Sequence, residues 1–264
     1  MKNRALPEPP LLDSELRELR MPSIQAGWRQ AAQKAARQGT GYSEYLAELV
    51  HLEITDRRDR RVQRRIKEAR FPSVKTLDTF EFDRQPGVSR DQVLALAQGD
   101  FVSRPENVVL LGEIGTGKTH LACAIGFACC QRGLRVRFIT AAELTTALVE
   151  AKASNRLSRK LEQLARFDLV ILDELGYVPF DRSGADLLFA FIAKVYEHRS
   201  LMVTTNLPFP RWSEVFLDAT AAAAVIDRIV HHATILQTAG KSYRLQAAEE
   251  ARLSDPADRP AGKK

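Results

Sequence analysis

A short run of glycines followed by lysine and threonine is the part of this sequence best suited to chemistry. Residues 112–119 read Gly-Glu-Ile-Gly-Thr-Gly-Lys-Thr, which satisfies the G-x-x-x-x-G-K-S/T pattern of a phosphate-binding loop. Glycines let successive backbone N–H groups turn toward a phosphate, Lys118 can reach the β- and γ-phosphates, and the Thr119 hydroxyl suits Mg²⁺. We therefore predict an ATP or GTP site with contacts from Gly112, Gly115, Thr116, Gly117, Lys118, Thr119 and His120.

Two adjacent carboxylates follow a second apolar run. Residues 169–174 read Leu-Val-Ile-Leu-Asp-Glu, so a strand-forming segment delivers Asp173 and Glu174 at its carboxyl end, as in a Walker B motif. Phosphoryl transfer depends mostly on positioning and charge neutralisation. We expect Asp173 and Thr119 to hold Mg²⁺ and Glu174 to orient and deprotonate the attacking water. The alternative, an exposed turn with two acids, is disfavoured because a phosphate loop precedes it.

Two further polar residues are candidates for the same reaction. Asn206 ends another apolar run and could hydrogen-bond the γ-phosphate or the attacking water; the alternative is a turn residue ahead of Pro208. Arg228 lies in an amphipathic helix and could reach the γ-phosphate of a neighbouring subunit. Alternatively, it forms an ordinary surface pair with Asp227. The predicted catalytic set is Lys118, Asp173, Glu174, Asn206 and Arg228.

Apolar runs and helical patterns alternate along most of the chain. Strands are expected at 107–112, 136–140, 168–173, 201–205 and 234–237, with helices between them, among them 118–131 and two within 141–166. This alternation predicts a parallel sheet covered by helices on both faces, a three-layer α/β fold of the P-loop NTPase class. Ligands bind such sheets beyond the carboxyl ends of the strands, where the phosphate loop falls.

The chain divides into three predicted parts. Residues 1–75 have helical periodicity, which predicts a small all-α N-terminal domain that ends near Pro72. Residues 76–246 form the predicted ATPase domain, and residues 247–264 are polar, as expected of a disordered tail. The linker 74–87 carries Phe80, Phe82 and Asp83, which are candidates for an adenine pocket; the two phenylalanines are equally well explained as core anchors.

The positive charge of the chain is concentrated in one segment. The formal net charge is +6, and residues 57–70 (RRDRRVQRRIKEAR), the basic strip, hold eight basic and two acidic residues. This density predicts contacts with a nucleic-acid backbone, because each neutralised phosphate releases counterions; a solvated helix face is the alternative. The predicted DNA contacts are Arg57, Arg58, Arg60, Arg61, Arg64, Arg65 and Lys67.

Composition argues against membrane and secreted classes. The sequence has no run of about 18 uncharged apolar residues and no apolar signal core at its beginning, so we expect a cytoplasmic protein without a membrane partner. Cys123, Cys129 and Cys130 fall in one apolar helix without metal-ligand spacing, which favours buried free thiols. His231 and His232 are adjacent, hence on different sides of a helix, and are interpreted as structural.

Four segments together resemble the IstB family. They are GEIGTGKTHLA (112–122), LVILDELGYVPFDRSGADLLF (169–189), MVTTNLPFPRWSEVF (202–216) and VIDRIVHHATILQTAGKSYRL (225–245). Members of that family are AAA+ ATPases that serve as helper proteins to bacterial insertion-sequence transposases, and they are related to the DnaC helicase loaders. The resemblance covers about residues 10–246 and implies an AAA+ sheet in the order 5-1-4-3-2.

The resemblance also implies roles and partners. Asn206 would be sensor I and Arg228 an arginine finger acting in trans, with ATP and Mg²⁺ as cofactors. It implies a homo-oligomer with composite intersubunit ATP sites that assembles on duplex DNA and recruits or regulates a cognate transposase. A helicase loader acting with single-stranded DNA is the alternative. The basic strip favours the transposition helper, since a domain that grips a protein would offer an apolar patch.

Relatives of this kind insert helices between the second and third strands along the nucleic-acid path. Lys152, Arg156, Arg159 and Lys160 are therefore secondary DNA-contact candidates, with a solvated helix face as the equal alternative. Too little chain follows Leu245 for a helical lid, so no sensor II arginine is assigned.

Overall fold

The structure is a computed structural model that describes residues 11–177, 179–239 and 242–243. The chain divides into two compact units, Met1–Gln63 and Arg64–Lys264. The predicted disordered tail, 247–264, and the carboxyl end of the predicted ATPase domain lie outside the described residues.

The N-terminal unit consists of helices in its described part. α1 (Leu12–Glu18) and α2 (Pro22–Gln38) pack with the first part of α3 (Tyr42–Ala69). Their contact encloses a small core of Leu16, Ile24, Trp28 and Leu49. Proline begins α2, where its missing N–H is not needed, and Gly39 ends it with a φ of 66°, a left-handed conformation that glycine adopts readily.

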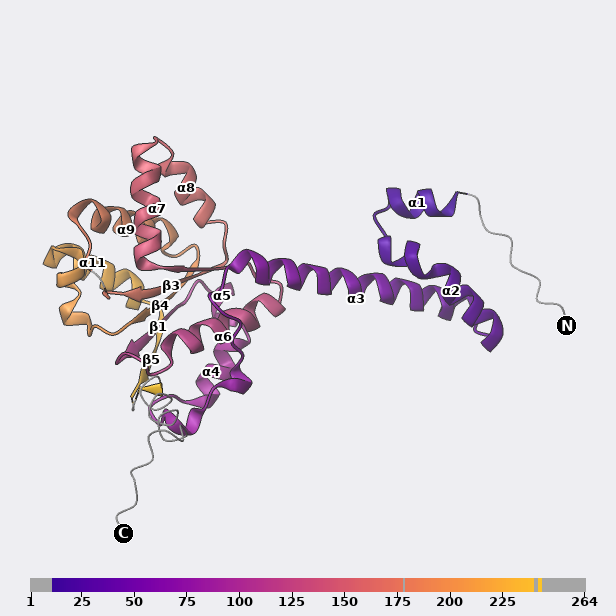
Figure 1. Ribbon diagram of the computed structural model, residues 1–264, viewed down its shortest axis with the longest axis horizontal. Coiled ribbons are helices and arrows are strands. Elements are labelled where there is room, and N and C mark those ends of the chain that lie inside the picture. The colour runs from indigo at the N-terminus through magenta and orange to yellow at the C-terminus, as the bar shows by residue number, and fades with distance from the viewer. Residues whose placement is uncertain (1–10, 178, 240–241, 244–264) are drawn as a thin grey trace, which may run out of the picture. The chain divides into compact units, whose positions relative to one another are not determined.

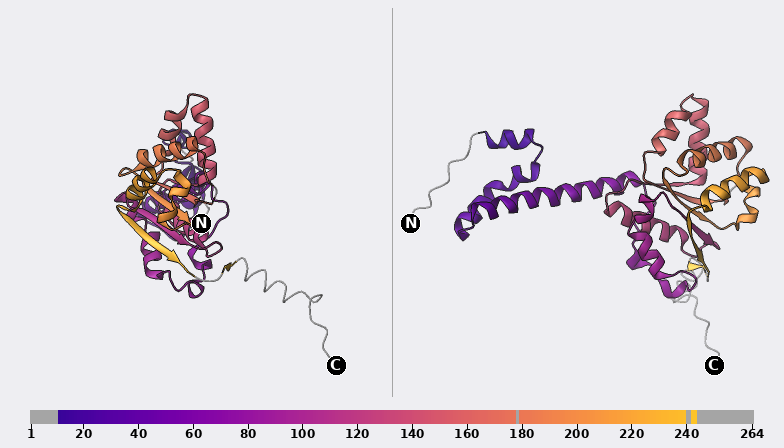
Figure 2. Two further views of the ribbon diagram at one scale, coloured as in Figure 1. Left: turned by 90° about the vertical axis from the view of Figure 1, so that its left-hand side faces the viewer. Right: turned by 180° about the vertical axis from the view of Figure 1, so that it is seen from behind.

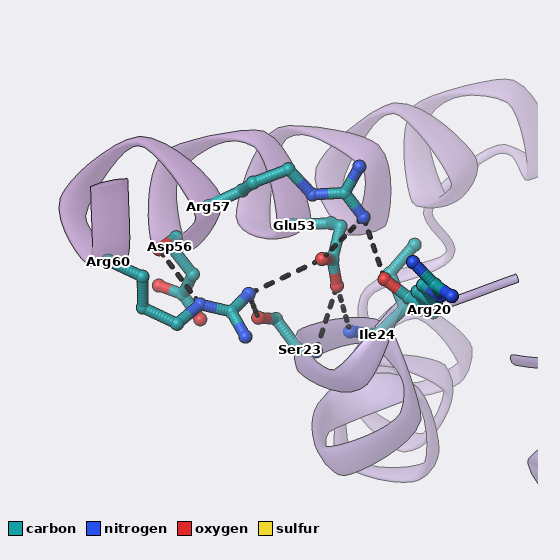
Figure 3. A network of polar contacts seen from close by, with 7 residues as sticks. All are labelled: Arg20, Ser23, Ile24, Glu53, Asp56, Arg57 and Arg60. Carbon is teal, nitrogen blue, oxygen red and sulfur yellow. Dashed lines mark hydrogen bonds and ion pairs between the residues drawn. The ribbon is translucent and has the colours of Figure 1, made fainter. Parts of the chain in front are cut away.

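A buried carboxylate fastens α3 to α2 within this unit, as Figure 3 shows. Glu53, only 4% exposed, accepts hydrogen bonds from the backbone N–H groups of Ser23 and Ile24 at 2.8 and 3.2 Å. Its other oxygen pairs with Arg57 at 3.1 Å and with Arg60 at 3.4 Å. Glu53 thus satisfies N–H groups in the first turn of α2, which have no partner within their own helix. Two arginines of the basic strip are therefore part of the framework of the N-terminal unit.

Five parallel strands form the centre of the second unit. They are β1 (Asn107–Gly112), β2 (Val136–Thr140), β3 (Leu169–Leu175), β4 (Ser200–Thr205) and β5 (Ala233–Thr238). Their order is β2-β3-β4-β1-β5, which confirms the order implied by the family resemblance. Three neighbouring strands lie in the middle of the sheet. The predicted phosphate loop follows β1, the two acids lie near the end of β3, and Asn206 follows β4.

Helices cover both faces of the sheet, which confirms the predicted three-layer fold (Figures 1 and 2). One face carries α4 (Arg90–Ala97), α5 (Asp100–Ser103) and α6 (Lys118–Gln131), packed on strand residues such as Val108 and Leu110. The other face, packed on Val109 and Leu172, carries α7 (Ala141–Ala153), α8 (Leu157–Leu164), α9 (Arg182–Val195), α10 (Ser213–Phe216) and α11 (Ala219–Val230). Successive residues of β1 serve opposite faces, as the two-residue period of a strand requires.

The division between the units differs from the predicted boundary at residue 75. It falls between Gln63 and Arg64, because Ile66, Ala69 and Phe71 belong to the apolar core around α6. The linker contains two short 3-10 turns, Leu77–Thr79 and Phe82–Arg84. The helices α4 and α5 that follow it were not anticipated from the alternation of strands and helices.

The three cysteines are buried free thiols, as predicted. Burial raises the pKa of each to about 12, so they stay protonated near neutral pH and act as apolar packing groups. Within the described residues, no helix has both the length and the apolar character needed to cross a membrane.

We predict that Glu53→Ala destabilises the N-terminal unit by about 2–3 kcal/mol, because buried N–H groups and two arginines lose their partner. Burial disfavours the charged carboxylate, but hydrogen bonds from Ile24, Ser23 and Arg57 outweigh it and lower the pKa of Glu53. A lowered folded-state pKa means that this contribution is complete above the unfolded-state pKa and is lost as pH falls through the folded value.

Denaturation of the full-length chain, followed by helical circular dichroism at neutral and acidic pH, measures the effect. Glu48→Ala is the matched control, since Glu48 forms an exposed pair with Lys34 at 3.5 Å and surface pairs contribute at most about 1 kcal/mol. Equal losses in the two variants, or a Glu53 effect that persists undiminished in acid, would contradict the prediction.

Candidate active site

The phosphate loop joins the end of β1 to the start of α6. Gly115 and Gly117 have φ values of 84° and 88°, in the region that favours glycine. A Cβ atom at Gly117 would lie 2.9 Å from the ring of Phe80. Lys118 begins α6, and its ammonium group donates to two loop carbonyl oxygens at 2.9 and 2.7 Å. The loop combines a helix N-terminus with a lysine charge, and both favour a bound phosphate.

Two hydroxyl groups hold Asp173 at the carboxyl edge of the sheet. The Asp173 residue is 3% exposed, and Thr119 Oγ1 donates to its two carboxylate oxygens at 3.0 and 3.2 Å. Thr204 Oγ1, from β4, donates to Asp173 Oδ1 and accepts the backbone N–H of Glu174 at 2.9 Å. Thr204 therefore connects both predicted acids. Sequence reasoning missed Thr204, although a polar residue in an apolar strand just before Asn206 was a signal.

A bulge in β3 separates the directions of the two acids. Leu172 pairs with Val203, and the next aligned pair is Leu175 with Thr205. Between these pairs β3 advances by three residues and β4 by two, so β3 contains one extra residue. Glu174 has a φ of 59°, a left-handed conformation that is costly for a residue with a Cβ atom. Bulges re-aim side chains beside functional sites. As a result, Asp173 is buried while Glu174 is exposed at the same edge.

The oxygen donors at this edge fit Mg²⁺. Burial raises the pKa of Asp173, although hydrogen bonds from Thr204 and Thr119 and the charge of Lys118 act in the opposite direction. A cation beside the carboxylate would favour its charged form. Mg²⁺ is usually held by one or two protein oxygens together with waters and substrate phosphates, which Asp173 and Thr119 can supply. Among the residues that the structure describes, no group of three His, Cys, Asp or Glu gathers as a metal centre.

Asn206 and His120 lie on different sides of the loop. Asn206 directly follows β4, which lies between β3 and β1, so it shares the edge of the acids and the loop. The His120 ring is directed to the linker, with Nε2 3.2 Å from both the Thr76 carbonyl oxygen and Thr79 Oγ1, and its centroid is 5.3 Å from that of Phe80. Burial lowers the pKa of His120, which favours its neutral form. His120 therefore belongs to the aromatic side of the site rather than to the acids.

Arg228 lies away from the phosphate loop of its own chain. Asn107, the first residue of β1, donates from its side chain to the Arg228 carbonyl oxygen at 3.2 Å, whereas the loop follows the last residue of β1. A rise of about 3.3 Å per residue puts about 16 Å between these two ends. The guanidinium donates to a carbonyl of its own helix at 2.8 Å and lies over the rings of Phe189 and Tyr196 at 5.2 and 5.9 Å. The structure therefore does not bring Arg228 together with the other predicted catalytic residues within one chain.

Residues of the basic strip differ in what they contact. Arg57 and Arg60 hold Glu53, and Arg65 donates to the carbonyl oxygen of Gly133 at 3.2 Å and pairs with Glu68 at 2.9 Å. The strip residues that are exposed and make no hydrogen bond or ion pair with any described residue include Arg58, Arg61, Arg64 and Lys67.

The predicted secondary DNA contacts gather at the inserted helices. Arg156, Arg159 and Lys160 line a groove of about 560 Å³ between α7 and α8, and Glu150 also lines it. Lys152 is exposed near the end of α7. Three cations and one acid give this groove a positive balance that suits a phosphate.

Comparison with known proteins assigns the chain to a family. A profile for the "IstB-like ATP binding protein" family matches residues 14–251. The chain belongs to this family. An insertion sequence IS21 ATP-binding protein of Pseudomonas aeruginosa is 41% identical over 240 residues, 91% of each chain. An insertion sequence ATP-binding protein of Sinorhizobium fredii is 41% identical over 238 residues, 90% of this chain and 80% of the relative.

Solved structures of two replication proteins share this fold. The DnaC helicase loader is similar with a TM-score of 0.50 and 24% identity, covering 62% of this chain and 96% of that one. DnaA from Aquifex aeolicus is similar with a TM-score of 0.54 and 17% identity, over 72% of this chain and 57% of that one. The predicted family and fold are thus both confirmed, and ATP binding is the property for which the IstB-like family is named.

We predict that Thr204→Val lowers turnover of Mg-ATP about tenfold and leaves ATP affinity nearly unchanged. Valine keeps the shape of the buried side chain but removes the hydroxyl that positions both acids, and one such hydrogen bond corresponds to about a factor of ten. Steady-state kinetics and nucleotide titration of the purified protein measure the two quantities. Thr146→Val, on the exposed side of α7, is the control. Turnover that is equal in both variants would refute the role of Thr204.

Proposed function

We propose that this chain is an ATP-hydrolysing helper of DNA transposition that assembles on duplex DNA in its ATP-bound state and recruits or regulates a transposase. The proposal rests on two findings taken together. The IstB family profile matches residues 14–251, and the hydroxyls of Thr119 and Thr204 both donate to Asp173. Relatives named for insertion sequences support a role in transposition.

The proposed hydrolysis assigns one task to each group at the sheet edge. Loop N–H groups and Lys118 bind the phosphates, and Thr119 and Asp173 hold Mg²⁺, which supplies charge neutralisation there. Glu174, exposed beside the buried Asp173, orients and deprotonates the attacking water. Asn206 contacts the γ-phosphate or that water, which makes it the group that distinguishes ATP from ADP.

The position of Arg228 supports a site completed by a second copy of the chain. Its backbone is fixed by Asn107 at the amino end of β1, whereas the phosphate loop follows the carboxyl end. An arginine so placed cannot stabilise the transferring phosphate of its own chain without a large rearrangement. In a homo-oligomer it would reach the ATP of a neighbour, so hydrolysis would depend on assembly.

The exposed cations of the basic strip support DNA as the surface on which assembly occurs. Arg58, Arg61 and Arg64 are exposed, and none makes an ion pair with another described residue. Backbone contacts by such groups give affinity without sequence readout. This suits a helper that marks duplex DNA by its shape and charge.

Exposed apolar side chains of the N-terminal unit are consistent with the alternative function, a helicase loader. The N-terminal unit leaves large apolar side chains exposed, among them Leu11 (64%), Leu19 (62%), Tyr42 (94%) and Leu46 (60%). Exposed apolar groups of this size mark protein-binding surfaces. They would serve a helicase partner in a loader and a transposase in a transposition helper, so the form of DNA that stimulates turnover separates the two functions.

We predict Mg²⁺-dependent ATP hydrolysis that duplex DNA stimulates more than single strands do, and that Arg228→Ala lowers the stimulated rate at least about 100-fold, since arginine fingers contribute about 10³–10⁵. Mixing Arg228→Ala with Glu174→Gln should restore part of the rate, because one kind of interface then contains both intact groups. ATPase assays with each variant alone and mixed measure this.

Three results would count against that scheme in different ways. Full stimulation of Arg228→Ala would remove its catalytic role. Absence of rescue in mixtures that still assemble would argue against action in trans. Stimulation by single strands alone would favour the helicase loader.

For the basic strip, we predict that Arg58→Gln with Arg61→Gln weakens duplex binding about tenfold and reduces the slope of log affinity against log salt by about 1.8, or 0.9 for each lost phosphate contact. Fluorescence anisotropy with duplex DNA at several salt concentrations measures both.

The matched control is Arg57→Gln with Arg60→Gln, which removes the same charge from the two arginines that hold Glu53. This pair should lower the melting temperature and change DNA affinity less. Unchanged binding by the Arg58 and Arg61 variant would move the DNA contact to the groove of Arg156, Arg159 and Lys160.

A further inference from the structure

A buried amide beside the phosphate loop has no hydrogen-bond partner. Gln85 follows the second 3-10 turn of the linker and has 0% exposure. Neither its Oε1 nor its Nε2 makes a hydrogen bond of good geometry, and the polar group that its amide influences is the Tyr243 hydroxyl, which already donates to Glu81. No other buried side-chain nitrogen or oxygen among the described residues lacks a partner. Buried polar groups in native proteins almost always have a hydrogen-bond partner, so an unpaired amide indicates that a bound ligand supplies the partner.

Contacts on both sides of Gln85 place it at the nucleotide site. The Phe80 ring lies against Gly117 of the phosphate loop and 4.9 Å from the ring of Phe82. Gly87 lies so close to the end of β5 that a Cβ atom there would be 2.8 Å from the Gln237 carbonyl oxygen. β5 pairs in parallel with β1, whose last residue begins the loop. The linker on either side of Gln85 therefore contacts the edge from which the loop begins.

Tyr243 connects the loop to the same linker. Its backbone N–H donates to the Gly115 carbonyl oxygen at 3.0 Å, and its hydroxyl donates to the Glu81 carbonyl oxygen at 2.8 Å. Burial and Glu81 raise the pKa of Tyr243, whereas Arg84 and the Gln85 amide act in the opposite direction, so phenol and amide are neighbours. The Gln85 backbone N–H also donates to the Phe82 carbonyl oxygen at 2.8 Å. Gln85 is thus a neighbour of Tyr243 and follows Phe80 and Phe82 in the linker, and aromatic groups of this kind line base pockets.

We propose that Gln85 reads the base of the bound nucleotide and selects adenine over other purines. A primary amide presents one acceptor and one donor side by side, which match the N6 amino group and N7 of adenine. Guanine and hypoxanthine present two acceptors, O6 and N7, at the same edge, so one amide atom would remain unpaired. Because the amide is fully covered, the base must displace a covering side chain as it binds. The inference rests on the nucleotide binding of the proposed function. It adds a hydrogen-bonding contact from Gln85 to the edge of the base, beside the aromatic residues of the linker.

The test is direct nucleotide binding by the full-length protein with Mg²⁺, without DNA or transposase. Competition against a fluorescent ATP analogue labelled on the ribose gives dissociation constants for ATP, GTP, ITP and 7-deaza-ATP. The wild-type chain should bind ATP roughly 10- to 100-fold more tightly than the other three, the range of a good bidentate amide–adenine pair. Gln85→Met, of similar length, should bind ATP as weakly as ITP and leave ITP affinity unchanged. Gln92→Met, at an exposed position in α4, should behave as wild type.

Each other outcome overturns the inference. Wild-type protein that binds ITP or 7-deaza-ATP as tightly as ATP excludes an N6–N7 contact, and this arm needs no variant that might misfold. A Gln85→Met variant that keeps wild-type ATP affinity, or that weakens ATP and ITP equally, gives Gln85 a structural role only. Because no DNA is present, failure of the transposition proposal would leave the outcome of this test untouched.

Discussion

The buried carboxylate of Asp173 is the constraint on which the second unit depends. A carboxylate that is 3% exposed is tolerated only when its oxygens are hydrogen-bonded or face a cation. Here the hydroxyls of Thr119 and Thr204 meet it from two different segments, and this requires β1, β3 and β4 to end side by side. The bulge in β3 and the left-handed conformation of Glu174 lie at the same place, where Asp173 is buried and Glu174 is exposed. The pair of Leu172 with Val203 before the bulge and that of Leu175 with Thr205 after it hold this strained backbone in place.

The two ends of β1 link the phosphate loop to the helix that carries Arg228. Gly112 begins the loop at one end, and at the other end the Asn107 side chain donates to α11 while its Oδ1 accepts the backbone N–H of Leu201 at 2.9 Å. A single strand thus fixes both halves of the proposed intersubunit site and keeps them apart. The separation is what would make turnover a property of the assembly rather than of one chain.

Local patterns predicted those features that depend on local sequence. The loop, the paired acids, the strand positions and the three buried cysteines follow from motif spacing and apolar periodicity, and the structure has them where the sequence indicated. Thr204 was missed because its role arises only when β4 lies beside the bulge of β3. Gln85 was missed for a similar reason: a glutamine in a linker looks solvated, and only the fold shows that it is buried beside Tyr243 from the other end of the unit. The two units divide at Gln63 and Arg64 rather than near residue 75, because Ile66 and Ala69, which lie within the basic strip, pack in the apolar core of the second unit.

The basic strip shows why counting charges in a sequence does not locate a DNA contact. Residues 57–70 account for a net charge equal to that of the whole chain, yet Arg57 and Arg60 are attracted to a carboxylate within their own unit. A guanidinium that is already paired gains less from a phosphate, because its existing hydrogen bonds must be shared or broken. Arg58 and Arg61, which pair with no other residue that the structure describes, can release counterions at no such cost. Whether a charged helix binds DNA thus depends on Glu53 as much as on the arginines, since removing that acid would free two cations and at the same time loosen the unit that presents them.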